Sequence, residues 1–182
     1  LSEPQTAGMM GNCRNSRTEL PMALDLFLSV TRIVSSTSTD GPGLRTALYL
    51  QGCNIHCPGC HNSSLWDISA GELLYVEAIW EQLQESDENI SILGGEPLMQ
   101  YVGLTALCKL IKERSDKSIW LWSGYTLSHI QQHYPEILKW VDVVVDGPFI
   151  KGLANPTLRF RGSSNQQITP ISQLGIKEYN MI

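Results

Sequence analysis

Four short apolar runs recur along the chain, each followed by a glycine-containing loop and then by a segment of helical periodicity. Near-continuous apolar runs of this length are typical of parallel strands whose two faces are covered. Their alternation with helical segments predicts a repeated strand–helix unit. The predicted strands are Thr46–Leu50, Asn89–Leu93, Ser118–Trp122 and Val141–Val145.

Helices are predicted between these strands. Thr126 is a suitable N-cap for the third helix, and Pro135 is expected to end or bend it. Cys108 belongs to the apolar stripe of the second helix, which predicts a small buried core residue. The apolar stripes of the first two helices are Leu73, Val76, Trp80 and Leu83, and then Leu104, Leu107, Cys108 and Ile111.

The length and the weakening of the pattern near the end set the domain organisation. A chain of 182 residues suits one domain, and beyond Phe149 the sequence predicts loops and one edge strand. The first 21 residues are polar and patternless, and Met22 is a suitable native start. We therefore expect an α/β domain with a mostly parallel sheet over residues 22–182, preceded by an extension over residues 1–21.

Charge and cysteine content narrow the function classes. Acidic residues outnumber basic ones by 18 to 13, and no stripe of Lys and Arg follows the pattern expected for nucleic-acid binding. No apolar run approaches the ~18 residues that cross a bilayer, and a signal-peptide layout is missing from the sequence. Three of the five cysteines lie within eight positions, too close for a disulfide framework. These features predict a cytoplasmic protein with a metal site and without nucleic-acid or membrane partners.

The candidate chemistry lies where the predicted strands end. In parallel α/β folds, ligands bind at the carboxyl ends of the strands because the loops converge there. The four loops at these ends are residues 51–62, 94–97, 123–125 and 146–148. We therefore expect them to face one pocket.

The first of these loops contains the spacing C-x3-C-x2-C, which supplies the thiolates of Cys53, Cys57 and Cys60. An all-cysteine cluster site and a closed zinc site both take four protein ligands, so three thiolates leave one position open. An iron with an open position can bind the amino and carboxylate groups of S-adenosylmethionine. The alternative is a zinc ion completed by His56 or His61.

The second loop, Gly94-Gly95-Glu96-Pro97, allows backbone to approach a ligand closely, because glycine has no side chain and tolerates positive φ. Alone, such a loop is also a common turn. One strand–helix unit downstream of the cysteine motif, it predicts a binding site for the methionyl part of S-adenosylmethionine.

With these motifs in order, the chain from about Ile33 to Ile168 resembles the radical-SAM activating enzymes, and most closely those that activate the anaerobic ribonucleoside-triphosphate reductase. Further matching segments carry the resemblance. They are Asp40-Gly41-Pro42-Gly43, Cys57-Pro58-Gly59-Cys60, Ile119 to Tyr125, Val145 to Phe149, and Phe160-Arg161-Gly162-Ser163-Ser164-Asn165-Gln166. The last two segments distinguish this group from its relatives.

The resemblance implies a shortened, open (βα) barrel that holds a [4Fe-4S] cluster and cleaves S-adenosylmethionine to a 5′-deoxyadenosyl radical. The radical would remove a hydrogen atom from a glycine of the large reductase subunit, with a flavodoxin- or ferredoxin-type protein as electron donor. By position, Cys53, Cys57 and Cys60 would bind the cluster. The residues implied to contact S-adenosylmethionine are Gly59, Cys60, His61, Gly94 and Gly95, followed by Glu96, Ser123 and Asp146.

The match has departures, and they leave alternatives open. Glu96 stands where this group often has Asp, Leu93 stands where Ser is common, and residues 35–39 form a short insertion. The target could therefore be another glycyl-radical enzyme, such as pyruvate formate-lyase, or the chain could be a small deazaguanine-forming synthase. A zinc-stabilised interaction module without catalysis is the alternative from another class, and residues 161–166 could be a capped turn only.

Overall fold

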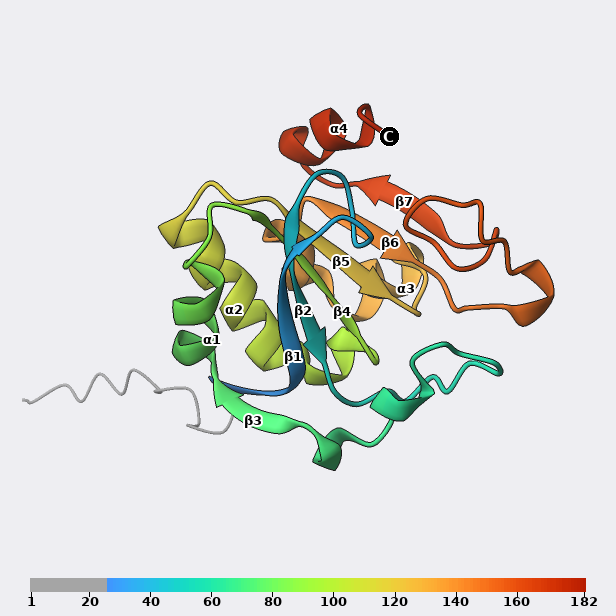
Figure 1. Ribbon diagram of the computed structural model, residues 1–182, viewed down its shortest axis with the longest axis horizontal. Coiled ribbons are helices and arrows are strands. Elements are labelled where there is room, and N and C mark those ends of the chain that lie inside the picture. The colour runs from blue at the N-terminus through green and yellow to red at the C-terminus, as the bar shows by residue number, and fades with distance from the viewer. Residues whose placement is uncertain (1–25) are drawn as a thin grey trace, which may run out of the picture.

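The computed structural model describes residues 26–182, which build one open seven-stranded sheet in the order β3-β1-β2-β4-β5-β6-β7 (Figure 1). The predicted extension, residues 1–21, lies outside the described residues. The strands are β1 (Phe27–Thr37), β2 (Arg45–Leu50), β3 (Glu72–Tyr75), β4 (Asn89–Gly94), β5 (Ile119–Ser123), β6 (Val143–Asp146) and β7 (Gln167–Pro170).

The centre of the sheet confirms the four predicted strands. β2, β4, β5 and β6 are mutually parallel neighbours, so their carboxyl ends meet at one edge of the molecule. β1 and β3 add antiparallel strands at one side, and β7 adds one at the other. The result is the expected mixed α/β architecture with an open, mostly parallel sheet, in which four of seven strands are parallel.

The start of the first predicted helical stripe is wrong. Leu73 lies in β3, opposite Ser29 of β1, and its side chain is 62% exposed. The helix begins only at Val76, and from there the predicted stripe is buried. Here the backbone pairs with β1, and this pairing places Leu73 in a strand in spite of the helical spacing. The spacing of apolar residues within one segment does not show such pairing with another strand.

The helices lie mainly against one face of the sheet, and α1 and α2 stand side by side there (Figure 1). The buried stripe of α2 confirms the prediction for Cys108, whose burial raises the pKa of its thiol. Thr126 caps α3 by accepting the His129 N–H, and the helix ends before Pro135, as predicted. The helices are α1 (Val76–Leu83), α2 (Tyr101–Arg114), α3 (Leu127–His133) and α4 (Gln173–Tyr179).

The other face of the sheet carries a smaller apolar cluster. Trp120, Val143 and Val145 are buried there, and Phe160 and Ile182 pack against them. The chain after β6 therefore covers this face with loop and C-terminal residues. None of the helices in residues 26–182 is long and apolar enough to cross a membrane.

Helix α4, which the sequence pattern did not predict, closes the amino ends of the strands. Its Glu178 accepts hydrogen bonds from Arg45, Ser118 and Trp120, with the Arg45 Nη1–Glu178 Oε1 distance at 3.1 Å. Arg45 is fully buried, so this ion pair lies inside the protein. Figure 1 shows α4 at the end of the sheet opposite to the arrowheads of β2 and β5.

Candidate functional site

The four loops predicted to converge line one cavity of about 160 Å³ at the carboxyl ends of β2, β4, β5 and β6. Its lining includes Gly124 and Gly147 from the third and fourth loops. The structure thus brings together seven of the predicted site residues, which are Cys53, Cys57, Cys60, Gly94, Gly95, Glu96 and Ser123.

The cysteine loop is fixed on both sides of its turn. The Cys53 N–H donates to the Trp66 carbonyl at 3.1 Å, and the Cys60 N–H donates to the Cys57 carbonyl at 3.0 Å. Gly59 adopts a φ of +76°, a conformation that glycine tolerates best. The sequence between the second and third cysteines therefore forms a tight turn that presents both thiols to the cavity.

The Cys57 thiol is partly buried. Burial raises the pKa of Cys57, and the backbone N–H of Phe149 acts in the opposite direction by donating a hydrogen bond to the sulfur. Hydrogen bonds to cysteine sulfur are among the factors that set the properties of iron–sulfur sites. This loop thus has a partner from the segment after β6.

Three thiols around a cavity fit a cluster. In residues 26–182, no three His, Cys, Asp or Glu side chains are close enough together to hold a single metal ion. A [4Fe-4S] cluster takes its thiolates on different irons, so its ligands surround a volume rather than converge on a point. Cys53, Cys57 and Cys60 line one cavity in this manner.

The packing of the chain itself requires glycine at both positions of the Gly94–Gly95 loop. A Cβ on Gly94 would lie 2.2 Å from the Leu50 carbonyl oxygen, and one on Gly95 would lie 2.1 Å from the Gly52 oxygen. The Gly95 N–H donates to Leu50 O, and the Glu96 N–H donates to Gly52 O. The loop after β4 therefore lies directly against the base of the cysteine loop, and any side chain at these positions would push them apart.

Glu96 and Ser123 join the loops after β4 and β5. The Ser123 hydroxyl donates to Glu96 Oε1 at 2.9 Å, and the Gly124 N–H donates to Glu96 Oε2 at 2.7 Å. The Leu98 N–H also donates to this carboxyl group. Glu96 is almost fully buried, and this burial raises its pKa to about 7 in spite of the three donors.

This raised pKa makes stability depend on pH. Because the folded pKa of about 7 lies above the ordinary value of 4.5, the folded state binds more protons between these pH values, and stability falls as pH rises through them. We expect the free energy of unfolding of the wild type, relative to Glu96→Gln, to fall by about 3 kcal/mol from pH 4 to pH 8. Denaturant unfolding of both proteins at several pH values measures this difference. A difference independent of pH would contradict the assignment.

Three predicted residues do not line the cavity. Gly59 packs against Lys151, and His61 lines a neighbouring groove. Asp146 is buried at the end of β6, where its Oδ2 accepts the Leu127 N–H at the start of α3, and its Oδ1 has no hydrogen-bond partner among the described residues. Each is adjacent in sequence to a lining residue, and their contact with S-adenosylmethionine stays a prediction.

The neighbouring groove, about 380 Å³, shares several lining residues with the cavity. Cys60, Trp122 and Phe149 line both, and Asp40 and Arg161 line the groove alone. Trp122 and Phe149 belong to segments that match the family, but these side chains were not predicted to line the pocket. Trp122 lies near the end of β5 and Phe149 lies after β6, so an aromatic residue at a strand end was the available signal.

Residues 161–166 form a turn that is held on the loop after β6. The Gln166 side chain accepts the Gly162 N–H at 2.8 Å and donates to the Gly147 carbonyl at 3.0 Å, and Asn165 donates to the Pro148 carbonyl at 2.7 Å. The segment is thus a turn, and this turn forms one wall of both the cavity and the groove.

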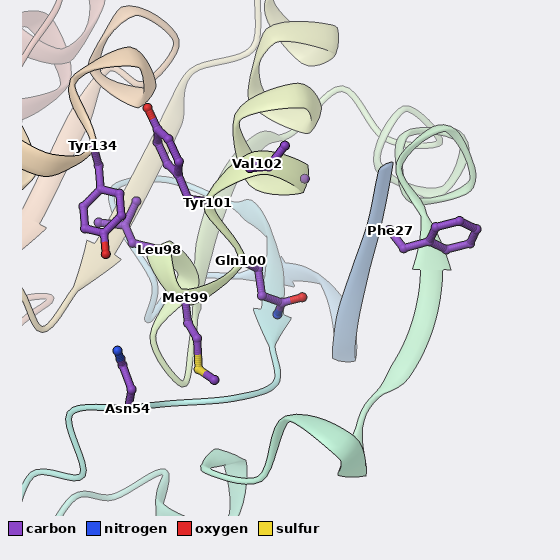
Figure 2. A pocket seen from close by; sticks show the side chains of 9 residues that line it. Phe27, Asn54, Leu98, Met99, Gln100, Tyr101, Val102 and Tyr134 are labelled. Atoms are coloured by element: carbon purple, nitrogen blue, oxygen red, sulfur yellow. The ribbon is translucent and has the colours of Figure 1, made fainter. Parts of the chain in front are cut away.

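A larger hollow of about 460 Å³ lies beside the site and contains none of the predicted site residues. Figure 2 shows Asn54, Leu98 and Tyr134 on one side of it and Phe27 on the other. Asn54 comes from the cysteine loop and donates to the Tyr125 hydroxyl. The cysteines themselves are absent from its lining, so the smaller cavity is the candidate site.

Comparison with known proteins gives the class of this site. A family model described as a 4Fe-4S single cluster domain matches residues 39–169, which include all four converging loops. This match supports an iron–sulfur cluster over the alternative zinc ion.

Individual relatives narrow the class further. The anaerobic ribonucleoside-triphosphate reductase-activating protein of Vibrio cholerae is 38% identical to this chain, and the match covers 71% of this chain and 89% of that protein. The protein of the same name from Escherichia coli K12 is 34% identical, and the match covers 71% of this chain and 90% of that protein. The phage T4 protein of the same name is 34% identical over 78% of this chain and 93% of its own. The chain therefore belongs to the family of anaerobic ribonucleoside-triphosphate reductase-activating proteins, as its motifs predicted. Among solved structures it is similar to QueE from Escherichia coli, with a TM-score of 0.49 and 15% identity over 84% of this chain and 67% of that one.

Proposed function

We propose that this chain binds a [4Fe-4S] cluster through Cys53, Cys57 and Cys60, cleaves S-adenosylmethionine reductively, and generates a glycyl radical on the large subunit of the anaerobic ribonucleoside-triphosphate reductase. The observation that carries the proposal is the convergence of the three cysteines with the Gly94–Glu96 loop on one cavity. Family membership supports the choice of the reductase as target.

A cluster held by Cys53, Cys57 and Cys60 would supply one electron for the reductive cleavage of a carbon–sulfur bond of S-adenosylmethionine, which would give a 5′-deoxyadenosyl radical. The protein contributes binding, orientation and the exclusion of competing reactions. Ile55, Leu93 and Phe149 give the cavity an apolar part that keeps water away. Glu96 and Ser123 hold two loops in register through their hydrogen bonds, which fixes the shape of the pocket.

The open sheet suits a macromolecular substrate. We propose that the fold is a shortened, open (βα) barrel, since a complete (β/α)8 barrel takes about 250 residues. An open side allows a loop of the reductase to reach the cofactor. The groove beside the cavity extends from Cys60 to Arg161 and gives such a loop a path. The proposal includes a cytoplasmic location and a flavodoxin- or ferredoxin-type electron donor.

The test is radical formation on the target. Protein reconstituted without oxygen is mixed with the anaerobic reductase, S-adenosylmethionine and dithionite, and the glycyl radical is quantified by electron paramagnetic resonance. A radical on the reductase supports the proposal. Cleavage of S-adenosylmethionine without any radical on this reductase, together with a radical on pyruvate formate-lyase, would assign a different target.

A change at Arg161 is expected to affect activation of the reductase without affecting cleavage of S-adenosylmethionine. Arg161 lines the groove, and its Nε is buried without a hydrogen-bond partner among the described residues, while its Nη1 donates to the Gln166 carbonyl. We expect Arg161→Ala to reduce glycyl-radical yield about tenfold by removing contacts of about 1–2 kcal/mol with the reductase, and to leave uncoupled cleavage of S-adenosylmethionine intact.

The matched control is Arg159→Ala. Arg159 is an exposed arginine two positions away that donates to the Ile182 carbonyl and does not line the groove. Its replacement should leave the radical yield unchanged. Equal yields for Arg161→Ala and the wild type would remove Arg161 from the account.

A further inference from the structure

The segment after β6 crosses the cysteine loop. Phe149 lines the same cavity as Cys57. Two residues later, the side chain of Lys151 lies along Gly59, where its Cδ is 3.0 Å from the position that a Cβ of Gly59 would take. The aliphatic part of Lys151 is therefore packed on the turn between Cys57 and Cys60.

This contact places a positively charged residue on the turn that carries Cys57 and Cys60. The Lys151 ammonium is two bonds beyond Cδ, and Lys151 is an exposed residue. Residues 53–62 contain no Asp or Glu, so the turn itself offers no acidic partner. The salt bridges found in residues 26–182 do not include Lys151.

Charge near a cluster affects its reduction. The reduction potential of an iron–sulfur cluster depends on net charge, on hydrogen bonds to sulfur and on solvent exposure. When a cluster accepts one electron, its net charge becomes more negative by one unit, and a nearby cation stabilises that state. An N–H donor to a ligating sulfur acts in the same direction.

We infer that Lys151 raises the reduction potential of the cluster held by Cys53, Cys57 and Cys60. This inference rests on the proposed function, because it requires the cluster at these cysteines. The packing of its aliphatic part on Gly59 keeps the lysine beside the turn between Cys57 and Cys60. The electron comes from the flavodoxin- or ferredoxin-type donor in the proposed reaction and from dithionite in the experiment.

Other charged residues near the site are separate from this effect. Glu96 follows β4 and Asp146 ends β6. Asp40 and Arg161 line the groove next to Cys60. They contribute to the potential of every variant equally. A change at Lys151 alone therefore isolates its contribution.

The experiment is a redox titration of the reconstituted protein, followed by electron paramagnetic resonance of the reduced cluster. For Lys151→Gln, we expect the ratio of reduced to oxidised cluster at a fixed potential to fall about threefold, which is about 30 mV for a one-electron couple. Lys151→Arg keeps the charge and should keep the wild-type potential. The shift should shrink at high salt, because the end of the side chain is exposed.

Lys177→Gln is the matched control. Lys177 is an exposed lysine on α4, at the opposite end of the sheet, so it removes the same charge far from the cluster. Equal potentials for Lys151→Gln and the wild type, in samples with equal iron and sulfide, would overturn the inference and leave the proposed function standing. Loss of the cluster from Lys151→Gln would also overturn it, because Lys151 would then hold the loop. A wild type without iron and sulfide would overturn both.

Discussion

Replacing Glu178 with glutamine is expected to lower the free energy of unfolding by about 3–5 kcal/mol, because it leaves the buried charge of Arg45 uncompensated. Arg45 is fully buried. Burial lowers its pKa, although the nearby Glu178 carboxylate acts to raise it. The Glu178 carboxylate also accepts from Ser118 and Trp120, each at 2.6 Å. With Asn89 of β4 as a further donor, one carboxylate on α4 thus accepts from three strands of the sheet, β2, β4 and β5.

Chemical denaturation of the reconstituted protein measures this loss. Lys139→Gln is the control, because its salt bridge with Glu136 is exposed and should contribute only about 0.5 kcal/mol. The double variant Arg45→Met with Glu178→Leu should recover part of the stability, since both buried charges are then absent while the buried Ser118 and Trp120 donors lose their acceptor. A Glu178→Gln variant as stable as the wild type would show that the ion pair is not buried as described.

Replacing Gly95 with alanine is expected to destabilise the protein by about 1–3 kcal/mol and to disturb the site. The added Cβ would lie 2.1 Å from the Gly52 oxygen and 2.6 Å from its carbonyl carbon, so one of the two loops has to move. The hydrogen bond from the Glu96 N–H to Gly52 would then lengthen. Since the cysteine loop starts at this point, the positions of the thiols should change as well.

Gly152→Ala serves as the control, because a Cβ at Gly152 meets nothing within 4 Å. Thermal unfolding and the absorption of the reconstituted cluster are compared for both variants. We expect lower stability and weaker cluster absorption for Gly95→Ala alone. If both variants match the wild type, the close approach of the two loops is not a constraint on this fold.

The sequence predicted the centre of the fold because that part is governed by local patterns. The apolar runs of the central strands are buried on both faces, so they appear as continuous hydrophobic segments. β1 is less evident, because after Val30 its residues are mostly half-buried or exposed. β3 and α4 depend on distant partners, β1 for the former and Arg45 for the latter. Such pairings across the chain have no signal in one segment.

The sequence also predicted which loops form the candidate site. The strand-end rule placed the cysteines, the Gly94–Gly95 turn, Glu96 and Ser123 in one cavity, because parallel strands bring these loops together. The rule does not give side-chain directions. It therefore did not show that Asp146 turns to the start of α3, or that Phe149 and Lys151 lie over the cysteine loop. These details depend on how the segment after β6 folds back.

The most direct test of the central claim is the reductive cleavage of S-adenosylmethionine. The protein is reconstituted without oxygen, S-adenosylmethionine and dithionite are added, and 5′-deoxyadenosine is quantified beside a Cys57→Ala variant. We predict product from the wild type and none from the variant, because Cys57 is one of three thiols at the cavity. A wild-type sample that contains iron and sulfide but forms no 5′-deoxyadenosine would contradict the account.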